Sequence, residues 1–258
     1  ITTWQVFALG LMHEYNDCHN KWGGSMYRLY SVAVWFLLCL GTSALAQTTL
    51  ETPNETVTGE ELYVACTFCH GAEAQGNDRR DGPALAGLEA WYIEKQIYNF
   101  RNGLRGYSDQ DIPGKVMHGS TPMIRNDFTI KSISEYIAGL EPGLPMARNA
   151  LGDRPFIWDS PYAGLDPSIT GDARAGEITY KSVCVVCHGA EGGGNELLGA
   201  GNLGYLSSIY MERQLMYFRD GIRGGQPADV SGQQMAAMAK ILTTDQAIAD
   251  VVAYIQEL

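Results

Sequence analysis

The chain has 258 residues, long enough for one or two globular domains, and 45% of them are hydrophobic. Its formal net charge is −11 at pH 7, from 18 basic and 29 acidic residues. This balance argues against a nucleic-acid-binding protein, because phosphate contacts need clusters of Lys and Arg. An acidic surface instead favours solubility, or steering toward a basic patch on a partner protein.

Residues 1–46 are predicted to be an upstream segment that ends in an export signal. A short basic lead, Met26–Arg28, is followed by the apolar run Ser31–Leu40 and by an A-x-A cleavage site at Ala44–Ala46. The alternative is an uncleaved membrane anchor, because Leu29–Ala46 is 18 residues long and carries no charge, near the lower limit of about 17 residues for a membrane-spanning helix. The pattern favours an exported protein and leaves membrane attachment open.

One motif occurs twice, as Cys66-Thr67-Phe68-Cys69-His70 and as Cys184-Val185-Val186-Cys187-His188. C-x-x-C-H is the pattern of haem c attachment: two thiols on one helical turn reach the two vinyl groups of a porphyrin, and the adjacent His presents its imidazole to the iron. A zinc ribbon usually separates its cysteine pairs by only about 15–20 residues, and a dithiol redox site needs a βαβ setting. We therefore predict two covalently bound haem c groups.

The motif belongs to a larger internal repeat. Residues 66–140 align with residues 184–258 without a gap, at a constant offset, and 26 of the 75 pairs are identical. Met117 is paired with Met235 in this alignment. The repeat predicts two domains of similar structure, and positions shared by both are the candidates for cofactor ligands.

Each domain is predicted to consist of helices separated by loops. Thr58 and Glu61 have the spacing of a capping box, which begins a helix, and apolar residues recur at helical spacing in two later segments. The expected order in the first domain is a helix from Thr58 into Cys66, a loop Gly71–Gly87, a helix Glu89–Arg101, a loop-rich segment Gly103–Asn126 and a closing helix Asp127–Leu140.

The two repeats are separated by a segment of different composition. Residues 141–170 hold five of the ten prolines of the chain, and each proline fixes φ and removes a backbone donor. We expect an extended, semi-rigid linker here. The second domain, residues 171–258, is then predicted to open with helical residues Glu177–Val183.

Taken together, these elements resemble class I cytochrome c. The resemblance lies in a short helix that ends in C-x-x-C-H-G, a loop, a middle helix, a Met and a closing helix with Tyr136 or Tyr254. The tandem arrangement is similar to the periplasmic dihaem cytochrome c4 group. The resemblance covers residues 58–140 and 171–258 and implies an all-α fold of two tandem cytochrome c domains.

The resemblance also implies a set of ligands. In such domains a proline after the motif lends its carbonyl to the proximal imidazole, which indicates Pro83, while the second repeat has Gly201 at that place. Two residues separate Tyr63 from Cys66 but three separate Tyr180 from the second motif, so we expect the first helices not to superpose fully. The implied set is thioether bonds at Cys66, Cys69, Cys184 and Cys187, proximal ligands His70 and His188, and distal ligands Met117 and Met235.

The repeat discriminates among the candidates for the distal ligand. Met117 is paired with Met235, whereas the neighbouring His118 and Met123 are paired with an alanine and an isoleucine, neither of which can bind iron. Met238 is paired with a serine. We therefore prefer Met117 and Met235.

Iron held by His and Met has no open position, and Met ligation raises the reduction potential. These properties predict an electron carrier, not an enzyme, that accepts electrons from a quinol-oxidising complex or a dehydrogenase and delivers them to a terminal oxidase. The alternatives are a cytochrome subunit of an oxidase or dehydrogenase complex anchored by Leu29–Ala46, and a dihaem peroxidase with one exposed iron. Four repeated arginines either pair with haem propionates or lie as solvated surface residues: Arg101 with Arg219, and Arg105 with Arg223.

Overall fold

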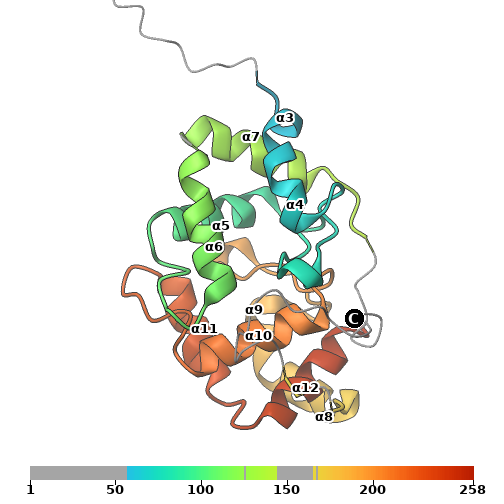
Figure 1. Ribbon diagram of the computed structural model, residues 1–258. Coiled ribbons are helices and arrows are strands. Elements are labelled where there is room, and N and C mark those ends of the chain that lie inside the picture. Colours follow the sequence, from blue (N-terminus) through green and yellow to red (C-terminus); the bar gives the residue numbers. More distant parts are fainter. Residues whose placement is uncertain (1–56, 125, 144–164, 167) are drawn as a thin grey trace, which may run out of the picture. The chain divides into compact units, whose positions relative to one another are not determined.

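A computed structural model describes the two predicted domains (Figure 1). The residues outside the description are 1–56, 125, 144–164 and 167. The predicted export signal or anchor, and most of the predicted linker, therefore lie outside the described residues. Helices supply the regular secondary structure of the described chain, apart from isolated bridges at Asn77–Gly82 and Asn195–Ala200. The all-α prediction is confirmed, and none of the described helices is long and apolar enough to cross a bilayer.

The first domain begins with the capping box that the sequence predicts. Helix α3 (Gly59–Tyr63) is capped by Thr58, whose Oγ1 accepts a hydrogen bond from the Glu61 amide at 3.2 Å, while the Thr58 amide donates to Glu61 Oε2 at 2.9 Å. The chain continues through a 3₁₀ turn, η1 (Val64–Cys66), into α4 (Thr67–His70). The C-x-x-C-H motif therefore lies at the end of a helical segment, as expected.

The second domain has one more residue between its tyrosine and its motif than the first domain has, and a π-helical turn accommodates it. Helix α8 (Ala173–Thr179), capped by Asp172, is followed by the π turn η5 (Tyr180–Cys184) and then by α9 (Val185–His188). A π turn holds more residues than an α turn, and a 3₁₀ turn holds fewer. The first helices thus differ locally, as the spacing predicts, but the tyrosines reach equivalent carbonyls: Tyr63 Oη donates to Gly71 O at 2.8 Å and Tyr180 Oη donates to Gly189 O at 2.7 Å.

Middle and closing helices form the core of each domain. They are α5 (Ala90–Arg101) with α7 (Asp127–Ala138), and α10 (Ser208–Arg219) with α12 (Asp245–Ile255). The predicted stripe on α5 is confirmed, because Ile93, Ile97 and Phe100 are buried. Each fully buried side chain of this size contributes about 1.5–3 kcal/mol relative to an exposed one. The ends of α5 and α7 differ from the predicted ends by one or two residues, which is the usual uncertainty of helix boundaries.

The first and last helices of each domain pack so closely that only glycine fits at the crossing (α3 with α7, α8 with α12; Figure 1). A side chain at Gly59 would place its Cβ 2.1 Å from Ser132 O, and one at Gly176 would place it 1.9 Å from Asp250 O. Both distances are far below van der Waals contact. The two glycines therefore allow the motif-bearing segments to lie directly on the closing helices.

The segments that carry the repeated methionines are helical, so the prediction of a loop-rich segment Gly103–Asn126 is wrong for Ile112–Met123. Helix α6 (Ile112–Ser120) carries Met117, and α11 (Val230–Ala239) carries Met235. A buried aspartate caps each one: Asp111 Oδ1 accepts from the amide of Gly114 at 2.9 Å, and Asp229 Oδ1 accepts from that of Gly232 at 3.0 Å. Glycine and proline in this stretch suggested a loop, but proline near a helix start is favourable.

Replacing Gly176 by alanine tests the close helix crossing. Gly176→Ala should lower the free energy of unfolding of the second domain by about 1–3 kcal/mol, the usual cost of overpacking. Gly119→Ala is the matched control, since this glycine also lies in a helix but has no atom within 4 Å of its Cβ position; it should be neutral, or stabilising by about 0.5–1 kcal/mol. Thermal unfolding of both variants measures the difference, and equal effects would contradict the packing argument.

Candidate functional site

His70 is the buried end of the first C-x-x-C-H motif. It is the last residue of α4, and its Nδ1 lies 2.9 Å from the carbonyl oxygen of Pro83. Because a carbonyl only accepts, Nδ1 carries the proton and Nε2 keeps its lone pair. Burial lowers the pKa of His70 and so favours the neutral imidazole, which is the form that binds metals. The predicted role of Pro83 as hydrogen-bond acceptor is confirmed.

His188 repeats this arrangement at the end of α9. Its Nδ1 lies 3.1 Å from Gly201 O, so the glycine carbonyl replaces the proline carbonyl of the first domain, as expected. Burial also lowers the pKa of His188. Each domain therefore presents one neutral imidazole whose Nε2 is available as a ligand.

The four motif cysteines are partly buried. Burial raises the pKa of Cys66 to about 11 and that of Cys184 to about 11, so both are protonated at neutral pH. Between the cysteines, by contrast, Phe68 and Val186 are exposed by 68% and 71%. In each motif the residue directly before the second cysteine thus faces solvent, while Val185 packs against the core of the second domain.

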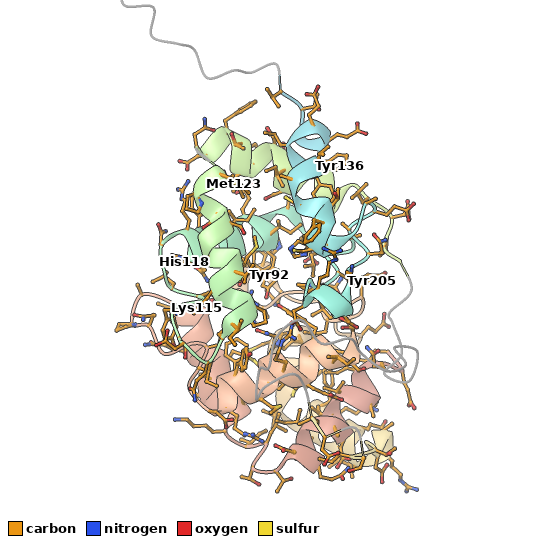
Figure 2. The ribbon with its side chains drawn as sticks, viewed as in Figure 1. Tyr92, Lys115, His118, Met123, Tyr136 and Tyr205 are labelled. Atoms are coloured by element: carbon orange, nitrogen blue, oxygen red, sulfur yellow. The ribbon has the colours of Figure 1, made fainter. Side chains whose placement is uncertain are left out.

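The predicted distal ligands differ from their competitors in burial and contacts. Met117 and Met235 are partly buried, whereas Met123, which is labelled in Figure 2, is 65% exposed. His118 Nδ1 is hydrogen-bonded to Phe100 O on α5, and its Cβ lies 3.2 Å from the Cβ position of Gly106. His118 is therefore held against the backbone of its own domain.

Loops with the sequence Arg-Gly rest on the first turns of the two methionine helices. The Cβ position of Gly106 is 2.2 Å from Gly114 O, and that of Gly224 is 2.2 Å from Gly232 O. Their φ values of 73° and 78° lie in the left-handed region, so glycine is needed both for conformation and for space. These contacts, with the aspartate caps, place Met117 and Met235 alike in their domains.

The four repeated arginines divide into two classes. Arg101 and Arg219 form partly exposed ion pairs with the starts of the closing helices, to Asp127 at 3.3 Å and to Asp245 at 2.9 Å. Arg105 and Arg223 are only 7% and 8% exposed, so the solvated alternative is wrong for this second pair. Sequence reasoning could not separate the classes, because burial here depends on contacts between the domains.

Arg105 and Arg223 meet in a hydrogen-bonded network across the domain boundary. Arg105 donates to Gln96 Oε1 at 2.9 Å and to Gln214 Oε1 at 3.1 Å, and Arg223 donates to the same two oxygens at 3.1 and 2.7 Å. Arg105 also donates to Tyr210 Oη at 2.7 Å. The hydrogen-bond acceptors described for these guanidinium groups are neutral, and Arg105 Nε is buried without a partner.

These features fit the cofactor that the motifs predict. Each of the two imidazoles has its Nδ1 engaged by a backbone carbonyl and follows the two cysteines of its motif, and the acceptors described for the two buried arginines are neutral. No carboxylate is among the described hydrogen-bond acceptors of these two arginines, although the buried carboxylate of Asp111 interacts electrostatically with Arg105. The propionates of a haem would supply charged acceptors there. The donor set is therefore that expected of two haem c sites.

Comparisons with known proteins agree with this site. The family model described as "Cytochrome c" matches residues 56–141 and 173–258. Cytochrome c4 of Pseudomonas aeruginosa is 28% identical over 233 residues, covering 87% of this chain and 97% of the relative. A thiosulfate dehydrogenase electron acceptor of Stutzerimonas stutzeri is 27% identical over 187 residues, covering 68% of this chain and 73% of the relative.

The crystal structure of reduced recombinant cytochrome c4 from Pseudomonas stutzeri has the same fold, with a TM-score of 0.56 and 23% identity over 78% of this chain and 96% of that one. Cytochrome c domains bind covalent haem c, so the two domains make this chain a dihaem electron carrier similar to cytochrome c4. Because the family model matches both repeats and more than half of the residues, the chain belongs to the cytochrome c family.

Proposed function

We propose that this chain carries electrons between respiratory partners in the periplasm, with one His/Met-ligated haem in each domain. Bound covalently, haem c supplies a one-electron iron couple at each site. The thiols of the two C-x-x-C-H motifs would hold the haems through thioether bonds. The residues in these roles are Cys66, Cys69, Cys184 and Cys187 for attachment, His70 and His188 as proximal ligands, and Met117 and Met235 as distal ligands.

The observation that carries this proposal is the equivalence of the two sites. In both domains the Nδ1–H of an imidazole donates a hydrogen bond to a backbone carbonyl. In both, a buried aspartate caps the helix that presents the methionine. The hydrogen bond fixes the tautomer of the histidine, and the cap fixes the position of the methionine sulfur. A closed coordination shell at each iron favours electron transfer over bond chemistry.

The redox partners follow from the same chemistry and from the relatives. A quinol-oxidising complex or a dehydrogenase is the proposed donor, and a terminal oxidase the proposed acceptor. One relative is itself described as the electron acceptor of thiosulfate dehydrogenase, which favours a dehydrogenase as the donor. Export through the signal-like segment 26–46 would place the chain with such partners.

Two other functions remain as alternatives with distinct tests. Retention of residues 29–46 would make the chain an anchored cytochrome subunit, recognised by membranes that keep it through salt washing. A dihaem peroxidase would need one open iron, and binding of carbon monoxide to a reduced haem would reveal it.

Substitution of the proposed distal ligand tests the site in the first domain. Met117→Ala should abolish that domain's share of the near-infrared sulfur-to-iron band. It should also lower the reduction potential of that haem by an amount on the order of 100 mV, because Met ligation raises the potential and axial ligands set haem potentials over a range of about 0.8 V. Met123→Ala is the matched control and should change neither property. The reverse result, or a wild-type spectrum of bis-histidine type, would reject Met117.

The buried arginine pair gives a second test, by potentiometry. If Arg105 lies beside a propionate, Arg105→Gln removes a positive charge that disfavours the oxidised iron. The potential of the first haem should then fall by tens of millivolts, where about 59 mV corresponds to a tenfold change for one electron. Arg101→Gln, which removes a guanidinium paired with Asp127 at the surface, should have little effect. Equal potentials in wild type and Arg105→Gln would contradict the pairing.

A further inference from the structure

The loop that holds His188 in place is contacted by the first domain at several points. Lys95 Nζ donates to Gly199 O at 3.4 Å, and Asn202 Nδ2 donates to Gly87 O at 3.2 Å. Between them, the Cβ position of Gly201 lies 2.7 Å from ring atoms of Tyr92 (Tyr92 is labelled in Figure 2). We call residues 199–202 the acceptor loop. Helix α5 and Gly87 of the first domain thus contact this loop on both sides of Gly201.

Gly201 is the central residue of the acceptor loop, since its carbonyl accepts the proton of His188 Nδ1 at 3.1 Å. In the first domain the acceptor is Pro83, at 2.9 Å. A proline ring fixes φ near −65°, whereas glycine has the greatest conformational freedom of any residue. The second domain therefore lacks the local restraint that its counterpart has.

Tyr92 explains why the second domain has glycine at this position. Its ring occupies the space that any side chain at residue 201 would need, so neither proline nor alanine fits without displacement. The same ring blocks movement of the Gly201 backbone toward α5. In the first domain the ring of Pro83 itself restrains the acceptor carbonyl. In the second domain Tyr92 of the neighbouring domain restrains the Gly201 carbonyl.

The corresponding loop of the first domain is also contacted across the boundary, by different chemistry. Arg213, the repeat counterpart of Lys95, forms a buried ion pair with Asp81 and donates to the Asp81 carbonyl at 3.4 Å. Asp81 is two residues before Pro83. Because Pro83 is already rigid, the orientation of its carbonyl depends less on this contact.

We propose that Tyr92 of the first domain is a positioning residue for His188 of the second, acting through the Gly201 carbonyl. The proposal rests on the function proposed above, in which His188 is the proximal ligand. A hydrogen bond at Nδ1 raises the basicity of a ligating imidazole and so stabilises the oxidised iron. A freer Gly201 carbonyl weakens that hydrogen bond, and the potential of the second haem rises while that of the first stays unchanged.

The test uses the full-length holoprotein and a titration of each haem. The two haems are distinguished by the shifted methionine methyl signals of the reduced protein, assigned with Met117→Ala. Tyr92→Ala should favour reduction of the second haem at least threefold, about 28 mV at about 59 mV per tenfold change, and should move the His188 Nδ1 proton resonance. Tyr92→Phe keeps the ring and should behave as wild type. Gly201→Ala disturbs the same contact from the other side and should move the same resonance and the same potential.

Tyr107→Ala is the matched control for general loosening of the boundary. Tyr107 also contacts glycines of the second domain, accepting from the Gly225 amide at 3.0 Å and donating to Gly221 O at 3.3 Å, but it does not contact the acceptor loop. It should leave the His188 resonance in place. If Tyr107→Ala shifts the second haem as much as Tyr92→Ala does, or if neither Tyr92→Ala nor Gly201→Ala shifts it, the proposal is overturned. Absence of methionine methyl signals from wild type would instead reject the proposed ligation.

Discussion

The hydrogen bond from each motif histidine to a backbone carbonyl is the constraint on which both sites depend. It places the proton on Nδ1 and leaves Nε2 as the only nitrogen that can bind iron. For this geometry the helix carrying the motif must end at the histidine, and the following loop must return to within about 3 Å of its ring, the ordinary hydrogen-bond distance. The glycine contacts at the helix crossings and the tyrosine hydrogen bonds to Gly71 and Gly189 serve the same end.

The two repeats form sites with the same chemical groups, but different residues hold those groups in place. The additional residue of the second domain is accommodated in a π turn before the motif, so that Tyr180 still reaches the carbonyl after His188. The carbonyl that accepts from the motif histidine belongs to a proline in the first domain and to a glycine in the second, where a tyrosine of the other domain fills the space. At the boundary two arginines and two glutamines from equivalent positions share hydrogen bonds. Each domain therefore contributes contacts to the surroundings of the other domain's motif.

Much of this structure could be predicted from local sequence. The C-x-x-C-H motif, the capping box at Thr58 and the helical stripe on α5 each lie within a few turns of the chain, and the gapless repeat relates the candidate ligands of one domain to those of the other. Helices α6 and α11 were missed because their glycines and Pro113 resemble loop residues. Their signal was the repeated aspartate three residues before Gly114 and Gly232, which caps a helix when its carboxylate is buried.

The properties that could not be predicted depend on distant residues. Whether Arg105 or Arg101 is buried depends on residues more than 100 positions away, such as Tyr210 and Gln214. The contact between Tyr92 and Gly201 has the same origin. A single sequence has no local pattern for such packing, although the paired substitution of Pro83 by Gly201 was a sign that the two domains have different neighbours.

An optical redox titration of the holoprotein under carbon monoxide tests the central claim most directly. Two closed His/Met sites predict two one-electron transitions, low-spin spectra in both oxidation states, and reduced bands that carbon monoxide leaves unchanged. Haem should also stay with the polypeptide in acid acetone, as thioether bonds require. A reduced haem that binds carbon monoxide at once, or one that the solvent extracts, would contradict the account for that domain.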